Sequence, residues 1–218
     1  MKTKSKPPKI LTICAILLLS AAIFSALFPD QDTGSDNVPT RLPGYNIELP
    51  DYIKQDFIPV NPYSRPGRWL ERVNNIVIHY VGNPGSSAKG NRNYFASLAN
   101  QRENNANHTY ASSHFIIGLN GEIIQCIPLT EISYASNHRN SDTISIEVCH
   151  PDKSGEFSNI TYQSLIKLSS WLCVQFDLNP EADLIRHYDV TGKICPKYYV
   201  ENPEAWKNLK SDVAAYQD

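Results

Sequence analysis

Hydrophobic and polar residues follow three different patterns along the chain. Residues 10–28 form a run of 19 positions without a charge, and a helix of that length spans the roughly 30 Å hydrocarbon core of a membrane. Residues 29–70 contain seven prolines, which interrupt every short apolar stretch. From residue 71 onward, short apolar runs alternate with segments of helical spacing, which indicates a domain built from both strands and helices.

The third pattern predicts an α/β domain over residues 71–216. Short apolar runs, often β-branched, predict strands at 76–80, 114–118, 122–127, 143–148 and 184–186. Asn120-Gly121 favours a hairpin between the second and third of these strands. Helical spacing predicts helices at 91–103, 161–176 and 203–216, the last starting at Asn202-Pro203 as N-cap and first turn. We expect a mixed central β-sheet flanked by helices.

The N-terminus predicts export from the cytoplasm. Residues 1–9 carry four lysines, whereas acidic residues follow the apolar run, so the positive-inside rule places the rest of the chain outside. We interpret residues 10–28 as a single-pass transmembrane signal-anchor of the cell membrane, with an extracytoplasmic domain. The alternative is a cleaved signal peptide and a secreted product, because Ser20-Ala21-Ala22 would satisfy a small-residue cleavage site.

Residues 29–70 are predicted to be a Pro-rich tether. Proline removes backbone donors that helices and sheets need, so the segment should be mostly extended. Its second part, residues 56–70, contains enough aromatic and apolar side chains to pack on the domain that follows.

The charge distribution excludes nucleic acid as a partner. After residue 28 the chain carries 16 basic and 22 acidic residues. A nucleic-acid-binding domain normally shows a basic patch or a high isoelectric point, and this part of the chain has a net negative charge instead.

Two histidines and a cysteine are the strongest candidates for a metal centre. His79 lies on the first predicted strand, where a lone histidine is more often a core residue. His187 follows the last predicted strand, and Cys195 comes eight residues later, across a glycine-containing loop that can bring both side chains to one ion. Zn²⁺ binds neutral imidazole and thiolate, and three protein ligands leave a position for water, as in catalytic zinc sites.

Five motifs occur in order within residues 73–215: Ile76-Val77-Ile78-His79-Tyr80, Ser113-His114-Phe115-Ile116-Ile117, Asn120-Gly121, Ser145-Ile146-Glu147-Val148 and residues 187–196. Together they resemble the zinc-dependent N-acetylmuramoyl-L-alanine amidases, which share their fold with phage lysins and peptidoglycan-recognition proteins. The resemblance implies a peptidoglycan substrate, cut at the amide between the lactyl group of muramic acid and L-alanine of the stem peptide. It also implies that His79, His187 and Cys195 hold Zn²⁺.

Amide hydrolysis needs a proton carrier and a group that stabilises the oxyanion. Glu147 is the one acid in an otherwise apolar strand, where an unpaired charge is costly unless it faces a cleft, and we expect it to be the general base. Through the resemblance, Lys193 is expected to stabilise the oxyanion. We expect Tyr80 and Asn83 to contact the substrate, and His114 to contact it or support the site rather than bind zinc. A monomer is expected.

Two departures from the family pattern affect this interpretation. Ser113 stands where lysins and recognition proteins often have a tyrosine, so Glu147 must carry the proton transfer. Tyr134-Ala135-Ser136-Asn137 replaces a motif that usually contains a cleft histidine, and His138 is an open candidate to substitute for it. The alternative function is a catalytically silent peptidoglycan-binding module of the same fold, although the presence of Cys195 argues against it.

The remaining cysteines do not predict a disulfide. Cys14 belongs to the apolar run, and Cys126, Cys149 and Cys173 are predicted to be free thiols, because small buried thiols are ordinary core residues. The alternative is one intramolecular bridge, since Cys126 and Cys149 lie in or directly after strands that are expected to be neighbours.

Overall fold

The computed structural model describes residues 42–102 and 107–216, which belong to one compact unit, Pro39–Asp218. The basic segment, the predicted signal-anchor and the start of the predicted tether lie outside the described residues. Within the described part of the chain, no helix has both the length and the apolar character needed to cross a membrane.

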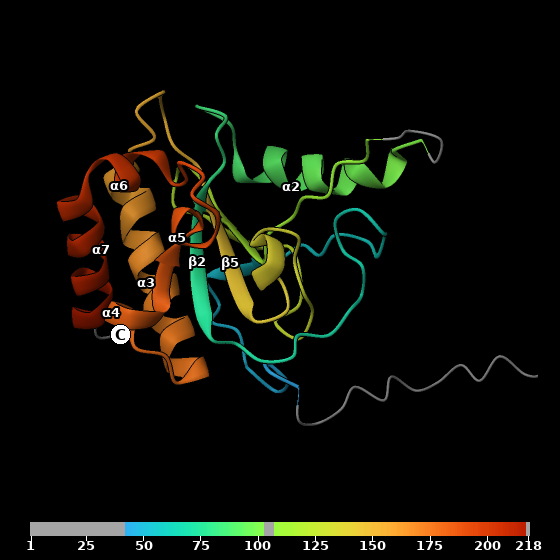
Figure 1. The fold of residues 1–218 in the computed structure, drawn as a ribbon, viewed down its shortest axis with the longest axis horizontal. Helices are drawn as coiled ribbons and strands as arrows, with labels where there is room; N and C mark the ends of the chain where they lie inside the picture. The colour runs from blue at the N-terminus through green and yellow to red at the C-terminus, as the bar shows by residue number, and fades with distance from the viewer. Residues whose placement is uncertain (1–41, 103–106, 217–218) are drawn as a thin grey trace, which may run out of the picture. The chain divides into compact units, whose positions relative to one another are not determined.

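Six strands form one mixed sheet (Figure 1). All neighbouring pairs are parallel except β3 and β4, which form an antiparallel hairpin. Isoleucine and valine dominate the central strands, as expected for strands buried on both faces. The predicted mixed sheet is therefore confirmed. Its order is β1 (Ile53–Gln55), β4 (Ile123–Gln125), β3 (Phe115–Ile117), β5 (Thr143–Val148), β2 (Asn75–Tyr80) and β6 (Leu184–Arg186).

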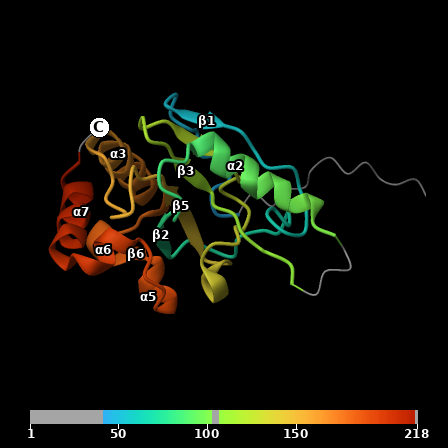
Figure 2. The same ribbon diagram turned by 90° about the horizontal axis from the view of Figure 1, so that it is seen from above.

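Helices cover both faces of the sheet (Figures 1 and 2). On one face, α3 (Asn159–Phe176) packs against the strands and α7 (Pro203–Ala215) packs beside α3, and together they enclose the larger core cluster. On the other face, α2 (Ala88–Ser97) crosses β3 and β4 over a smaller cluster. The short helices are α4 (Pro180–Asp183) before β6, and α5 (His187–Thr191) and α6 (Lys197–Glu201) between β6 and α7.

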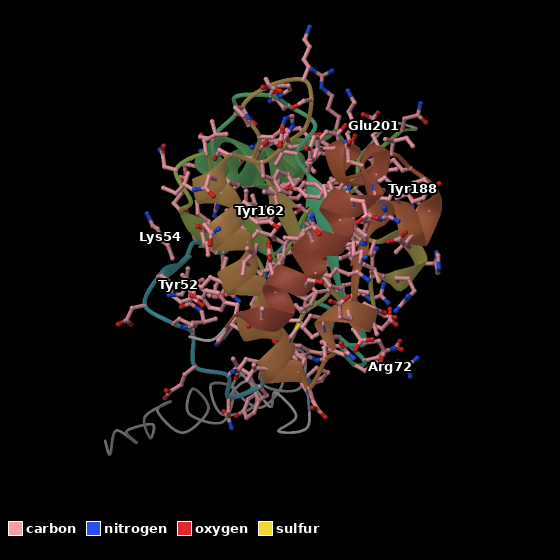
Figure 3. The ribbon with its side chains drawn as sticks, turned by 90° about the vertical axis from the view of Figure 1, so that its left-hand side faces the viewer. Tyr52, Lys54, Arg72, Tyr162, Tyr188 and Glu201 are labelled. Atoms are coloured by element: carbon pink, nitrogen blue, oxygen red, sulfur yellow. The ribbon has the colours of Figure 1, made fainter. Side chains whose placement is uncertain are left out.

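Figure 3 looks onto the face formed by α3 and α7. Tyr162 of α3 lies between the two helices, and its hydroxyl donates to Asp212 Oδ2 of α7 at 2.6 Å. The Lys167 ammonium of α3 lies 4.1 Å above the ring of Tyr52. Helix α3 therefore holds both the C-terminal helix and the chain that leads into β1.

The structure differs from the sequence prediction in where α2 begins, in the turn between β3 and β4, and in the cap of α7. The first helix begins at Ala88 rather than residue 91, because the Ser87 side chain accepts a hydrogen bond from the Gly90 N–H and caps it earlier. In the β3–β4 hairpin Gly121 alone has a positive φ, 81°, so Asn120 does not adopt the left-handed conformation. Asn202 does not cap α7 with its side chain.

The segment predicted as a tether contributes to the folded unit ahead of residue 71. Strand β1 pairs in parallel with β4 at the edge of the sheet, and Ile58 and Leu70 are buried in the core. The Arg65 guanidinium donates twice to the Glu131 carboxylate, at 2.6 and 2.8 Å. The packing expected for residues 56–70 is thus present, and the sheet extends further toward the N-terminus than the sequence predicted.

Candidate active site and metal centre

The carboxyl ends of three parallel strands place the candidate site. His79 on β2 lies opposite Glu147 on β5, so both side chains leave the same face of the sheet. Strand β6 ends at Arg186, which is paired with Ile78, and His187 follows as the first residue of α5. Strand register thus brings polar side chains that are far apart in the sequence together at the carboxyl ends of β2, β5 and β6.

His79, His187 and Cys195 form the candidate metal centre. Their ligand atoms all lie within 4.8 Å of one another. The distance from Cys195 Sγ to His79 Nδ1 is 3.8 Å, and the two imidazole centres are 4.6 Å apart. All three residues are buried. The structure therefore brings together the three residues that the sequence proposes as ligands.

The chemistry of these side chains fits Zn²⁺. His79 Nε2 and His187 Nδ1 are buried without a hydrogen-bond partner, which costs free energy unless a ligand satisfies them. Burial, aided by His187 and Lys193, holds the pKa of His79 well below its usual range, and burial with Lys193 lowers the pKa of His187 to about 4. Both imidazoles are therefore neutral near pH 7, the form that binds metal.

The thiol completes the donor set. Burial, with a contribution from Glu147, raises the pKa of Cys195 to about 12. A thiol that is neutral on its own is deprotonated when it coordinates a divalent cation. Zinc binding at this centre would therefore release a proton from Cys195.

Asn137 orients the second imidazole. Its Oδ1 lies 3.1 Å from His187 Nε2, and a proton held on Nε2 leaves Nδ1 free as a ligand. Asn137 has a φ of 54°, in the left-handed region that asparagine tolerates better than most residues. The sequence did not predict this contact. The available signal was that Asn137 belongs to the segment that departs from the family motif.

Glu147 and Lys193 line the same cavity as the candidate ligands. Glu147 Oε2 is enclosed without a hydrogen-bond partner, and burial raises the pKa of this carboxyl to about 8, although the Lys193 ammonium opposes the rise. A strongly perturbed carboxyl in a cleft is typical of acid–base groups. Lys193 is exposed and follows Gly192, the left-handed cap of α5. Both predicted catalytic residues thus reach the site.

The cavity has a volume of about 430 Å³. Tyr80 lines it, as the sequence predicts. Other walls come from α2, from the loop before β3 and from the segment before β5. The lining residues on these walls are Phe95, Tyr110, Ala111, Ser112, Tyr134, Ala135, Asn137 and Asn140.

His114 and Asn83 lie outside this cavity. His114 is completely buried. Its Nδ1 accepts a hydrogen bond from the Ser145 backbone N–H at 3.0 Å, and its Nε2 lies 2.8 Å from the Glu131 carbonyl. Because the protein satisfies both nitrogens, His114 cannot contact a substrate in the cavity. Asn83 is exposed and lines a neighbouring cavity of about 480 Å³, which shares Val81 with the first.

His138 is exposed and is not among the residues that line the cavity. It therefore does not take the place of the missing cleft histidine.

The cysteines of the described residues are all free thiols: Cys126, Cys149, Cys173 and Cys195. The prediction of three free thiols besides the candidate ligand is confirmed. Cys14 lies outside the described residues.

Together, the mixed sheet and the candidate metal centre at its strand ends define the class to which this protein belongs. A family model described as N-acetylmuramoyl-L-alanine amidase matches residues 69–198. The chain is a member of the N-acetylmuramoyl-L-alanine amidase family.

Curated relatives agree with this assignment. The N-acetylmuramoyl-L-alanine amidase BlyA of Bacillus subtilis (strain 168) is 33% identical over 179 residues, which cover 73% of this chain and 46% of BlyA. CwlL of Bacillus licheniformis, also named an N-acetylmuramoyl-L-alanine amidase, is 32% identical over 74% of this chain and 46% of its own length. The chain thus spans about half the length of these relatives.

Solved structures support the fold. PlyL superposes with a TM-score of 0.62 at 19% identity, covering 76% of this chain and 99% of PlyL. The catalytic domain of XlyA gives a TM-score of 0.57 at 24% identity, covering 74% of this chain and 98% of that domain.

Proposed function

We propose that this protein is a zinc-dependent N-acetylmuramoyl-L-alanine amidase. It hydrolyses the amide between the lactyl group of N-acetylmuramic acid and L-alanine of the peptidoglycan stem peptide. The observation that carries the proposal is the convergence of His79, His187 and Cys195 with Glu147 in one cavity of a member of this family.

The two imidazoles and the thiolate hold the metal. When bound, zinc polarises the amide carbonyl, makes a water molecule acidic near neutral pH and favours the ionised forms of nearby acids. Asn137 keeps the His187 ring in the orientation that leaves Nδ1 free.

Glu147 moves the proton that the reaction requires. Its carboxylate takes a proton from the water whose oxygen attacks the carbonyl carbon, and it later gives that proton to the nitrogen of the leaving L-alanine. The new C–O bond forms as the proton is taken, and the C–N bond breaks as the proton is delivered. The Lys193 ammonium stabilises the negative charge that develops on the carbonyl oxygen between these steps.

Product analysis tests the proposed activity. The zinc-loaded full-length chain should release stem peptides with a free L-alanine amine from purified peptidoglycan and leave the reducing ends of the glycan unchanged. New reducing ends would indicate a glycosidase, and amines from within the stem would indicate an endopeptidase. Binding without any release would indicate the silent binding module.

Metal analysis tests the proposed ligands. The wild-type chain should hold about one zinc ion, and Cys195→Ser and His187→Ala should each lose most of it. Cys173→Ser is the matched control, because Cys173 is also a buried free thiol but lies on α3, where it faces the core. A full equivalent of zinc in both ligand variants would refute the assignment.

We further propose that residues 10–28 anchor the protein in the cell membrane as a monomer, with the amidase domain outside the cytoplasm. The charge-free apolar run and the lysines ahead of it support this proposal. The full-length chain should stay with membranes through a carbonate wash, and protease added from outside should remove the domain. A soluble product starting near Ile23 would establish the signal peptide instead.

A further inference from the structure

Four aromatic rings gather at one wall of the cavity. Tyr110 and Tyr134 line the cavity and meet edge to face, with ring centres 5.5 Å apart and an interplanar angle of 84°. Tyr63 and His108 contact Tyr110 at centroid distances of 5.6 and 6.5 Å, and they lie 4.8 Å from each other. We refer to Tyr63, His108, Tyr110 and Tyr134 as the aromatic wall.

The two residues after Tyr110 tie its loop by backbone hydrogen bonds to Tyr63 and to Tyr134. The Ala111 N–H donates to the Tyr63 carbonyl at 3.2 Å, and the Ser112 N–H donates to the Tyr134 carbonyl at 3.1 Å. The Tyr134 N–H in turn donates to Ser112 Oγ at 2.8 Å. The wall is therefore organised before any substrate arrives, which reduces the entropy lost on binding.

The loop of Tyr110 is held by these backbone hydrogen bonds, but the aromatic ring of Tyr110 is exposed. Its exposed fraction is 54%, which is high for an aromatic side chain that lines a cavity. Its neighbours in the ring cluster leave part of the ring surface free to contact a ligand. A large exposed aromatic surface in a cleft is a typical binding element.

The polar residues beside the wall are uncharged. Ser112, Asn137 and Asn140 line the cavity, whereas the acid and the ammonium among its described lining residues, Glu147 and Lys193, belong to the catalytic group. A ligand at the wall therefore meets aromatic faces together with hydroxyl and amide groups. A neutral sugar ring matches this surface, since it has an apolar C–H face and a rim of hydroxyl and acetamido groups. A stem peptide that carries carboxylates does not.

We propose that the aromatic wall binds the sugar ring of N-acetylmuramic acid, with Tyr110 stacked on its C–H face. This inference rests on the proposed function, because it assigns one side of the scissile amide to this wall. The enzyme then recognises the saccharide as well as the amide, and a peptide that carries a lactyl group without the sugar is a poor ligand.

A pair of ligands that differ only in the sugar tests this proposal. The zinc-loaded full-length Glu147→Gln variant, chosen to slow turnover, is titrated by calorimetry with an N-acetylmuramoyl-dipeptide and with the D-lactoyl form of the same dipeptide. We expect the sugar-bearing ligand to bind at least about tenfold more tightly. Adding Tyr110→Ala should remove this preference, because it should lower the affinity for the sugar-bearing ligand alone. Tyr110→Phe should keep most of the preference.

Tyr45→Ala is the matched control, because Tyr45 is an exposed tyrosine that does not line the cavity. It should leave both affinities unchanged. Equal affinities for the two ligands in the starting variant would overturn the proposal, and so would an equal loss of both affinities in Tyr110→Ala. Product analysis of wild-type digests decides the proposed function separately, so the two failures are distinguishable.

Discussion

The imidazole of His114 accepts a hydrogen bond from the backbone N–H of Ser145, in the place that a neighbouring strand would otherwise take. Its Nδ1 accepts from the Ser145 N–H at 3.0 Å, one residue before β3 and β5 begin to pair at Phe115 and Ile146. Ser113 Oγ donates to the Ser145 carbonyl at 2.9 Å. Two side chains therefore fix the backbone of β5 two residues ahead of Glu147.

This arrangement makes the stability of the fold depend on pH. Burial lowers the pKa of His114 from 6.5 to about 4, although its bond to the Glu131 carbonyl opposes the shift. Between these pH values the unfolded chain binds a proton that the folded chain does not. The free energy of unfolding should therefore fall as the pH drops through this range, by up to about 3 kcal/mol.

Urea unfolding at a series of pH values measures this effect. His114→Asn should be less stable at pH 7 but should lose this part of the pH dependence, whereas His138→Asn, at an exposed position, should keep it. Parallel pH profiles for wild type and His114→Asn would contradict the prediction.

Removing the Asn137 side chain should weaken zinc binding without unfolding the protein. Asn137→Gly deletes the partner of His187 Nε2, and glycine accepts the φ of 54° without strain. We expect zinc affinity to fall roughly 10- to 100-fold, as is typical when the partner of a metal-binding histidine is lost. Competition with a chelator measures the affinity. Asn46→Gly is the control, since Asn46 also has a positive φ, 66°, and is exposed away from the cavity. Unchanged zinc affinity in Asn137→Gly would show that this contact does not orient the ligand.

Glu147→Gln should abolish most turnover while leaving zinc bound. The amide is nearly isosteric but cannot carry the proton, so the rate should fall by at least about 100-fold. Because the change also removes a carboxyl whose pKa is raised to about 8 by burial, the melting temperature should hold or rise slightly. Turnover, zinc content and melting temperature are measured on the same preparations. Loss of zinc or of the fold would make Glu147 a structural residue, and near-normal turnover would assign the proton transfer to another group.

The segment ahead of residue 71 should contribute strongly to stability. Ile58 is fully buried, so Ile58→Ala should cost about 2–5 kcal/mol of unfolding free energy. Val60, two residues later, is 64% exposed, and Val60→Ala should change it by less than about 0.5 kcal/mol. Denaturant unfolding compares the two variants. Equal, small effects would mean that this segment is only a tether.

The long periodic elements and the short apolar strands β3, β4 and β6 could be predicted from the sequence, whereas β1 and the short helices α4, α5 and α6 could not. The alternating apolar residues of β5, which are Ile144, Ile146 and Val148, and the helical spacing of α3 define the type of each element and nearly its ends. Strand β1 has three residues, of which only Ile53 is buried, so its sequence carries no periodic signal. It becomes a strand because β4 offers an unpaired edge.

The residues of the candidate site also divide into those that the sequence reveals and those that only the tertiary structure reveals. His79, Glu147 and His187 are recognisable because their residue types suit metal binding and proton transfer and because they stand at strand ends. Cys195 is recognisable because it follows His187 across a short loop. His114 has an equally suggestive type, but its role depends on which way its side chain turns, and the fold turns it inward onto Ser145. Tyr110 lies in a loop without periodicity, and only tertiary contacts bring it to the cavity.

The register between His79 and Glu147 has a consequence for how this protein can vary. Because the two residues face each other on adjacent strands, their separation follows from the spacing of the sheet, about 4.8 Å between strands. A slip of one residue in either strand would turn one side chain to the opposite face, under α3. Loop residues that shape the rest of the cavity, such as residues 107–110, lie outside the sheet and carry no such constraint. Their length and sequence can change, and substrate preference with them, while the reactive groups keep their positions.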